Sequence, residues 1–262
     1  MFSIYTSAFN LERGEFDYRT LQRFADFVGE SGEVVVALNK SSDGSESTLK
    51  QFTSQFPNVR IIDCDVSYSD PDMDGKIKNA ALQETTRPFK IGLDLDEHIP
   101  LWQRPLWENM ARALEQTPVK ALFIPSVDLY SSADRVSAIG QKWYLHKAGC
   151  FRGTVNFARR EDGTHDVTRS DSCELIDTEG NLVMAYSVSP NFQDLDSRIK
   201  FLESGEAPFV VHTGYLDLER RARLHKSFWL KHWAIENGAE IYIPTELKEF
   251  TKQTSTHKLR IE

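Results

Sequence analysis

Short apolar runs alternate with segments of helical periodicity through the first hundred residues of the chain. Four runs have the length and composition of buried strands, at residues 2–9, 33–38, 59–62 and 89–93. Between them, apolar side chains recur at helical spacing, which predicts helices from residue 17, from residue 49 and over residues 74–86. This alternation predicts an α/β fold with a mainly parallel sheet flanked by helices on both sides.

Polar residues follow three of the predicted strands, and in such sheets ligands bind beyond the carboxyl ends of the strands. Asn10 ends the first run, a polar loop over residues 39–45 ends the second, and Asp94 and Asp96 end the fourth. We therefore expect these side chains to converge on one crevice.

Asp94 and Asp96 are the strongest chemical signal in the first half. Residues 89–93 alternate like a strand, and continuing that alternation puts both carboxylates on one face and Leu95 in the core. Two carboxylates so placed can hold a divalent cation whose other ligands are phosphate oxygens, and Glu97 and His98 enlarge the cluster. The alternative is a polar strand end with solvated acids.

The predicted helix before this strand carries a polar stripe of Lys76, Asn79 and Gln83. Lys76 and Asn79 are candidate donors to phosphate or ribose, whereas Gln83 fits a solvated helix face.

The second half of the chain is less regular. An amphipathic helix is predicted over 102–116, a strand over 121–125, and strands at 142–145 and from Phe151 that extend the sheet. Residues 159–177 are rich in charge and are interpreted either as a loop covering an acceptor or as a solvated hairpin.

His212 ends the strand-like run 209–212, and Thr213 and Gly214 follow it. It is a candidate metal ligand at the end of its strand, or else a hydrogen-bonded core histidine. A helix with a packing face and a basic cluster follows it, then a strand-like run at 240–244 and a polar tail from Lys248 that we expect to be loosely held.

Composition narrows the possible functions. The chain has 262 residues and a formal net charge of -8, which argues against non-specific binding to nucleic acid. No apolar segment approaches the ~20 residues of a transmembrane helix, and the amino terminus lacks the basic region of a signal peptide. Three scattered cysteines without metal spacing suit a reducing, cytoplasmic compartment.

Two motifs in order resemble the family-2 glycosyltransferases, inverting enzymes of Rossmann-like GT-A fold that use nucleotide-sugar donors. The first is Leu38-Asn39-Lys40-Ser41-Ser42-Asp43-Gly44-Ser45, and the second is Lys78-Asn79-Ala80-Ala81-Leu82 leading to Leu93-Asp94-Leu95-Asp96-Glu97. The match covers about the first 100 residues, and the later His212-Thr213-Gly214-Tyr215 is similar to a carboxy-terminal element in some of these enzymes. Leu38 stands where the family usually has an acid that reads the base, so the donor need not be a uridine nucleotide.

The resemblance implies a metal-dependent, hexosyltransferase-like enzyme. It implies Mn²⁺ or Mg²⁺ on Asp94, Asp96 and His212, with a base among Glu174, Asp171 and Asp166. The residues it implies at the donor are Thr6, Ala8, Asn10, Asn39, Asp43, Lys76, Asn79 and Asp94. Residues 1–100 would form the nucleotide-sugar half, residues 101–247 the acceptor half of the same domain, and residues 248–262 the tail.

Two other functions share this layout. A sugar-nucleotide-forming nucleotidyltransferase usually has a Gly-rich, basic loop after its first strand, which this chain lacks; a non-catalytic sugar- or partner-binding module would be expected to lose the metal acids, which are present. The acceptor stays undetermined among glycan, lipid-linked sugar, protein and modified nucleic acid.

Overall fold

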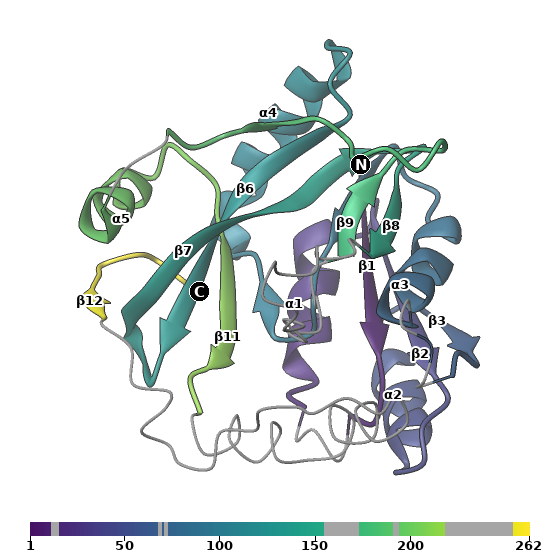
Figure 1. Ribbon diagram of the computed structural model, residues 1–262. Helices are drawn as coiled ribbons and strands as arrows, with labels where there is room; N and C mark the ends of the chain where they lie inside the picture. Colours follow the sequence, from purple (N-terminus) through teal and green to yellow (C-terminus); the bar gives the residue numbers. More distant parts are fainter. Residues whose placement is uncertain (12–15, 68–69, 71–72, 155–172, 191–193, 218–253) are drawn as a thin grey trace, which may run out of the picture.

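A computed structural model describes residues 1–11, 16–67, 70, 73–154, 173–190, 194–217 and 254–262 (Figure 1). Its first half alternates strictly between strands and helices, as the sequence predicts. The elements are β1 (Phe2–Ala8), α1 (Arg19–Val28), β2 (Glu33–Asn39), α2 (Ser45–Thr53), β3 (Val59–Cys64), α3 (Met73–Gln83) and β4 (Phe89–Gly92).

The second half contributes long antiparallel strands and short connecting elements. These are β5 (Glu97–His98), the 3-10 turn η1 (Leu101–Gln103), α4 (Arg104–Glu115), β6 (Ala121–Tyr130), β7 (Ser132–Lys147), β8 (Phe151–Thr154), β9 (Cys173–Ile176), β10 (Ala185–Ser187), α5 (Leu195–Glu203), β11 (Val210–Tyr215) and β12 (Ser255–Thr256). No helix in the described ranges is both long and apolar enough to span a bilayer.

One mixed sheet organises the molecule in the order β3-β2-β1-β4-β7-β6-β11-β5, with β10 added to β6 and β12 to β7. Strands β1 to β4 are mutually parallel, as is the β6–β11 pair, whereas β7 runs antiparallel to both β4 and β6. The predicted fold class, a mixed and mainly parallel sheet flanked by helices, is confirmed and is consistent with a Rossmann-like GT-A fold.

The expectation that the strand from Phe151 extends this sheet is wrong. β8 pairs with β9 in a separate two-stranded sheet. The side chain of Asn79 on α3 binds both backbone polar groups of Arg152, which holds β8 over that helix.

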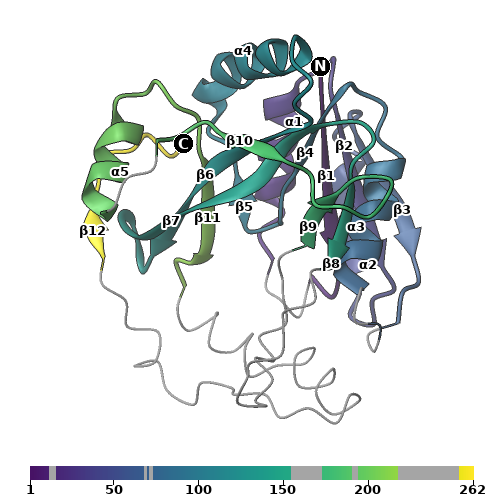
Figure 2. The ribbon, with the colours of Figure 1, turned by 45° about the horizontal axis from the view of Figure 1, so that its top comes forward.

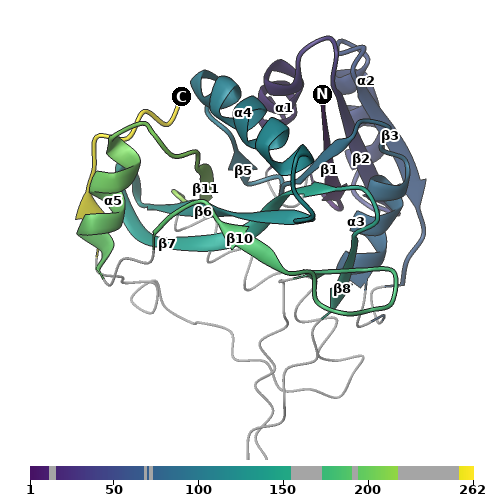
Figure 3. The same cartoon turned by 90° about the horizontal axis from the view of Figure 1, so that it is seen from above.

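Successive side chains of the first strands point to opposite faces of the sheet and pack into two apolar layers. Phe2 and Ile4 pack with α1 and α4, whereas Tyr5 packs on the opposite face with Ile77 of α3. Figure 3 shows α1 and α4 on one side of the sheet and α3 on the other. Burial on both faces explains why β1 and β2 are continuous apolar runs.

A third apolar cluster lies between α5 and strands β6, β7 and β11, and the described end of the chain belongs to it. Leu259 is buried there, β12 pairs with β7, and the indole of Trp102 donates to the carbonyl of Arg260 at 2.7 Å. Figure 2 shows β12 beside α5. For residues 254–262 the expectation of a loosely held tail is wrong, because they fill an apolar cluster and a strand edge.

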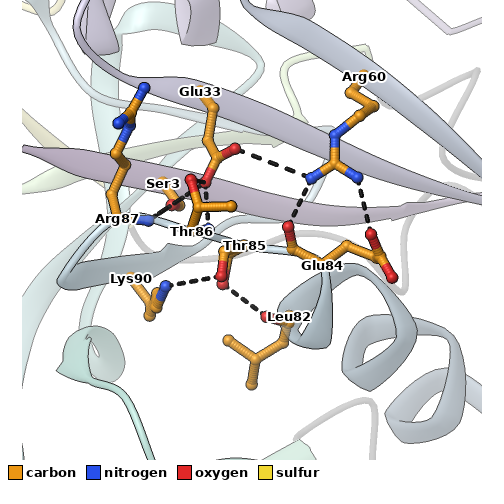
Figure 4. A network of polar contacts seen from close by, with 9 residues as sticks. All are labelled: Ser3, Glu33, Arg60, Leu82, Glu84, Thr85, Thr86, Arg87 and Lys90. Atoms are coloured by element: carbon orange, nitrogen blue, oxygen red, sulfur yellow. Dashed lines mark hydrogen bonds and ion pairs between the residues drawn. The ribbon is translucent and has the colours of Figure 1, made fainter.

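Glu33 ties together the ends of the strands that lie opposite the expected ligand edge (Figure 4). Its Oε1 accepts hydrogen bonds from Ser3 Oγ at 2.6 Å and from Thr86 N and Oγ1 at 2.5 and 2.9 Å. Arg60 joins the same region by binding Glu84 Oε2 at 2.8 Å. Burial by itself would raise the pKa of Glu33, but the hydrogen bonds from Ser3, Thr86 and Arg87 outweigh it and lower the pKa. The carboxylate thereby fixes the loop that leads into β4.

We expect Glu33→Ala to lower the free energy of unfolding by about 1.5–3 kcal/mol, the range for losing hydrogen bonds to a charged group. Glu46→Ala is the matched control, since Glu46 pairs with Lys50 on an exposed helix surface and its loss should cost less than about 1 kcal/mol. Urea denaturation of both variants measures the difference. Equal effects would show that Glu33 does not anchor the loop.

Candidate active site

The chain turns sharply between Asp94 and Glu97, directly after β4. Glu97 N donates to Asp94 O at 3.0 Å, and Asp94 N donates to the side-chain Oε2 of Glu97 at 2.9 Å. The prediction that Asp94 and Asp96 share one face of a strand is therefore wrong, because the strand ends at Gly92. Asp94 instead meets Lys78, and Asp96 meets His212.

The buried side chain of Glu97 anchors this turn. The residue is 1% exposed, and its Oε1 accepts hydrogen bonds from Lys142 Nζ and Tyr144 OH, both at 2.6 Å. Burial would lower the pKa of Lys142, but the carboxylates of Glu97 and Asp94 raise it to about 12. The expectation that His98 enlarges the acidic cluster is wrong, since its Nε2 meets the carbonyl of Ile261 at 2.9 Å. Glu97 does lie beside Asp94 and Asp96, and the two carboxylates add to the effect of burial in raising its pKa.

Three consecutive residues of β11 form a cradle around Asp96, namely His212, Thr213 and Gly214. Antiparallel pairing with β5 sets His212 opposite Glu97, next to Asp96. Thr213 donates to the carbonyl of Asp96 from both N and Oγ1, at 2.8 and 2.9 Å. His212 Nε2 lies 3.1 Å from Asp96 Oδ2. A Cβ on Gly214 would lie 2.5 Å from the same oxygen, so only glycine leaves room for the pair.

The second ring nitrogen of His212 is also occupied. Nδ1 lies 3.0 Å from Asp128 Oδ1, because the parallel pairing of β6 and β11 sets these two residues side by side. Burial would lower the pKa of His212, but Asp96 and Asp128 outweigh it and raise the pKa to about 10. Without a bound cation, His212 is thus an imidazolium between two carboxylates at neutral pH.

Lys78 is a site residue that the polar stripe of its helix did not single out. Its Nζ lies 2.7 Å from Asp94 Oδ1 and 3.1 Å from Asp74 Oδ2, and its side chain is 12% exposed. The predicted donor Lys76 instead pairs with Asp70 and is half-exposed. A signal for Lys78 did exist, since it lies four residues after Asp74 and directly before Asn79.

Asn39 and Asn79 each use both ends of the side-chain amide to hold backbone. Asn39 accepts from Val66 N at 2.8 Å and donates to Val66 O at 2.9 Å. Asn79 makes the equivalent pair with Arg152, at 2.7 Å in both directions. Both predicted ligand-binding residues therefore position neighbouring segments at this edge of the sheet.

The remaining predicted donor residues surround the carboxyl ends of β1 and β2. Asn10, with a φ of 42°, accepts from Ser42 N at 3.0 Å, whereas its Nδ2 is buried without a hydrogen-bond partner in the described structure. Asp43 accepts from Ser45 N at 3.1 Å, at the start of α2. Thr6 and Ala8 are buried. Because the methyl group of Ala8 has no polar atom, this residue can offer a ligand hydrogen bonds only from its backbone.

Of the three candidate bases, Asp166 and Asp171 lie outside the described residues. Glu174 lies on β9, opposite Gly153 of β8, in the small sheet held over α3 by Asn79. The choice among these carboxylates stays a prediction.

A buried polar chain underlies the end of β4 and was not predicted. Tyr5 OH donates to His146 Nε2 at 2.9 Å, because the other ring nitrogen of His146 donates to the carbonyl of Lys147. Arg152 Nε donates to Tyr5 OH at 2.7 Å, and its guanidinium occupies the space that a side chain at Gly92 would fill. Burial, with the nearby charge of Arg152, lowers the pKa of His146 to about 3.

In the described part of the chain, no three His, Cys, Asp or Glu side chains are grouped so that they could hold a metal ion by themselves. Of the predicted set, the structure brings Asp96 and His212 together, while Asp94 pairs with Lys78. Any further metal ligands would have to come from elsewhere, for example from a bound substrate.

Comparisons with known proteins give similarity to solved structures alone: no family model and no curated protein matches the sequence. Similar structures include S. aureus TarS 1-349 in complex with UDP and with UDP-GlcNAc, each at 19% identity over 50% of this chain with a TM-score of 0.40. Another is the mannosyltransferase PcManGT from Pyrobaculum calidifontis in complex with GDP-Man and Mn²⁺, at 19% identity over 47% of this chain with a TM-score of 0.38. The match spans 37%, 36% and 34% of those chains, respectively.

We expect His146 to make the fold sensitive to acid. Because its pKa is about 3 in the fold and near 6.5 when unfolded, the unfolded chain binds the extra proton between these values, and stability falls as pH drops from 6.5 towards 3. His146→Gln lacks this titrating group. The unfolding free energy of the wild-type protein minus that of His146→Gln should therefore shrink as pH falls from 6.5 towards 3. Urea denaturation at pH 7, 5 and 4 measures it; a constant difference would contradict a buried neutral imidazole.

We expect Gly214→Ala to separate Asp96 from His212, since the new Cβ would also lie 2.7 Å from His212 Nε2. The pKa of His212 should then fall from about 10 towards its ordinary value. Gly140→Ala on β7 is the control, because a Cβ there meets nothing within 4 Å. Histidine-labelled NMR titration reports the pKa; an unchanged value in Gly214→Ala would show that the cradle does not enforce the contact.

Proposed function

We propose that the protein is a metal-dependent glycosyltransferase that moves a sugar from a nucleotide-sugar donor to an acceptor hydroxyl, with inversion at the transferred sugar. The observation that carries the proposal is the approach of Asp96 Oδ2 to His212 Nε2 at 3.1 Å, beside the acidic turn that follows β4. In a sheet of parallel strands this edge is where ligands bind.

Asp96 and His212 fit a shared cation. Two ligands at right angles on a metal with bonds of about 2.1 Å are separated by about 3 Å, close to the distance between Oδ2 and Nε2. A carboxylate with an imidazole favours Mn²⁺ over Mg²⁺. A bound cation would supply positive charge to the diphosphate leaving group. Two protein ligands leave coordination positions for phosphate oxygens.

Lys78 adds a second positive charge at the same turn. Its ammonium is held by Asp94 and Asp74 and is largely shielded from solvent, which strengthens its field on a nearby phosphate. In this arrangement Asp94 positions Lys78, and Asp96 with His212 would hold a cation. A lysine here would neutralise charge that builds up on the departing diphosphate.

Inversion requires a carboxylate that takes the proton of the acceptor hydroxyl on the face opposite the leaving group. We assign this role to Glu174, with Asp171 and Asp166 as the alternatives. The support for Glu174 is its strand: β9 is joined through β8 to α3, the helix that carries Lys78.

The donor base would lie against the ends of β1 and β2. The side chain of Leu38 is buried in the core, so it offers a base no hydrogen bond. We therefore propose weak selectivity for uridine, with Asn10, Asn39 and Asp43 shaping the base and ribose site through the loop that they hold.

Asp96→Asn should keep the fold and lower the rate of nucleotide-sugar hydrolysis. Losing a residue that supports a metal ligand costs roughly 10–100-fold, and losing the ligand itself should cost more. Turnover of UDP-, GDP-, ADP- and TDP-sugars with Mn²⁺ measures this without knowledge of the acceptor. Asp196→Asn, on the exposed surface of α5, has the same change in charge and should leave turnover unchanged. Near-normal turnover in folded Asp96→Asn would overturn the assignment of the site.

A further inference from the structure

We propose that Asp128 is a positioning residue for metal binding. It orients the imidazole of His212 so that the unprotonated Nε2, with its lone pair, faces the position of the cation beside Asp96. This inference rests on the proposed function, because it assumes that Asp96 and His212 share a cation.

The sheet places Asp128 where this role requires it. β6 and β11 are parallel neighbours, and Asp128 and His212 are direct partners in their register. Asp128 Oδ1 lies 3.0 Å from Nδ1 on one side of the ring, and Asp96 Oδ2 lies 3.1 Å from Nε2 on the other. The ring therefore bridges two carboxylates that come from different strands and turns.

The two carboxylates have different chemical consequences for the ring. A carboxylate can only accept a hydrogen bond, so Asp128 keeps a proton on Nδ1 in either protonation state of the ring. When a cation takes the place of the proton on Nε2, the neutral imidazole that remains is already the tautomer with a free lone pair facing Asp96. A hydrogen bond from the far nitrogen of a metal-bound histidine to a carboxylate is a general way to fix its tautomer and orientation.

Apart from Asp96, which lies at the Nε2 side that the cation would occupy, Asp128 is the hydrogen-bonding partner of the ring in the described structure. The ring of Tyr215 packs edge-on at 5.5 Å between centroids, and Gly214 leaves the space beside Nε2 clear. Within the described structure, the side chain of Asp128 makes a hydrogen bond to His212 and to no other group. A carboxylate at the surface of the sheet with this single partner is better explained by the imidazole than by the general stability of β6.

Asp128→Asn tests the inference with Mn²⁺ alone, since the amide can donate to Nδ1 and stabilise the tautomer with its proton on Nε2. We expect the Mn²⁺ affinity, measured from free Mn²⁺ by electron paramagnetic resonance, to fall about 10–100-fold. Asp196→Asn should match the wild-type protein, and Asp96→Asn should lose most of the binding. Thermal melts of the same samples, corrected to folded protein, separate binding from stability; Asp128→Ala replaces Asp128→Asn if the latter does not fold.

The outcomes separate this inference from the proposed function. Wild-type affinity in Asp128→Asn, or a lower melting temperature with unchanged affinity per folded molecule, overturns the role of Asp128 and leaves the metal site standing. Wild-type protein that binds no Mn²⁺ overturns the metal site and the inference together. Weakened binding with an intact fold supports both.

Discussion

The candidate site depends on the hydrogen bonds that the buried carboxylate of Glu97 accepts. This carboxylate receives hydrogen bonds from the backbone of Asp94 and from the side chains of Lys142 and Tyr144, so the chain must turn after β4. That turn sends Asp94 towards α3 and Asp96 towards β11, and the two carboxylates acquire different neighbours. A buried carboxylate without these partners would carry a large desolvation cost, so these hydrogen bonds stabilise the turn.

The site is assembled across the sheet and not within one segment. Lys78 reaches it from α3, Asp128 from β6, and His212 from β11. Asp128 and His212 come together because the register of β6 and β11 makes them direct partners. In this arrangement, a mixed sheet brings residues of both halves of the chain to a common edge.

The sequence predicted the repeating strands and helices well, because buried strands and amphipathic helices have distinct periodicities. It also pointed to Asp96 and His212, each predicted at a strand end, although Asp96 lies in a turn and His212 lies within β11. It did not reveal Asp128, whose meaning depends on a partner 84 residues away. Nor could it show that Glu97 anchors the turn or that Asn79 holds Arg152. The sequence gives the type of a side chain but does not indicate whether that side chain binds a ligand or the protein backbone.

The separation of these partners along the chain also orders their assembly. Asp96 meets His212 across 116 residues, and His98 meets Ile261 across 163. During synthesis, strands β1 to β4 can pair while the acidic turn still lacks β11 and the segment around residue 261. Contacts of such long range form late and slowly. A nascent chain would therefore pair its first strands well before Asp96 can meet His212.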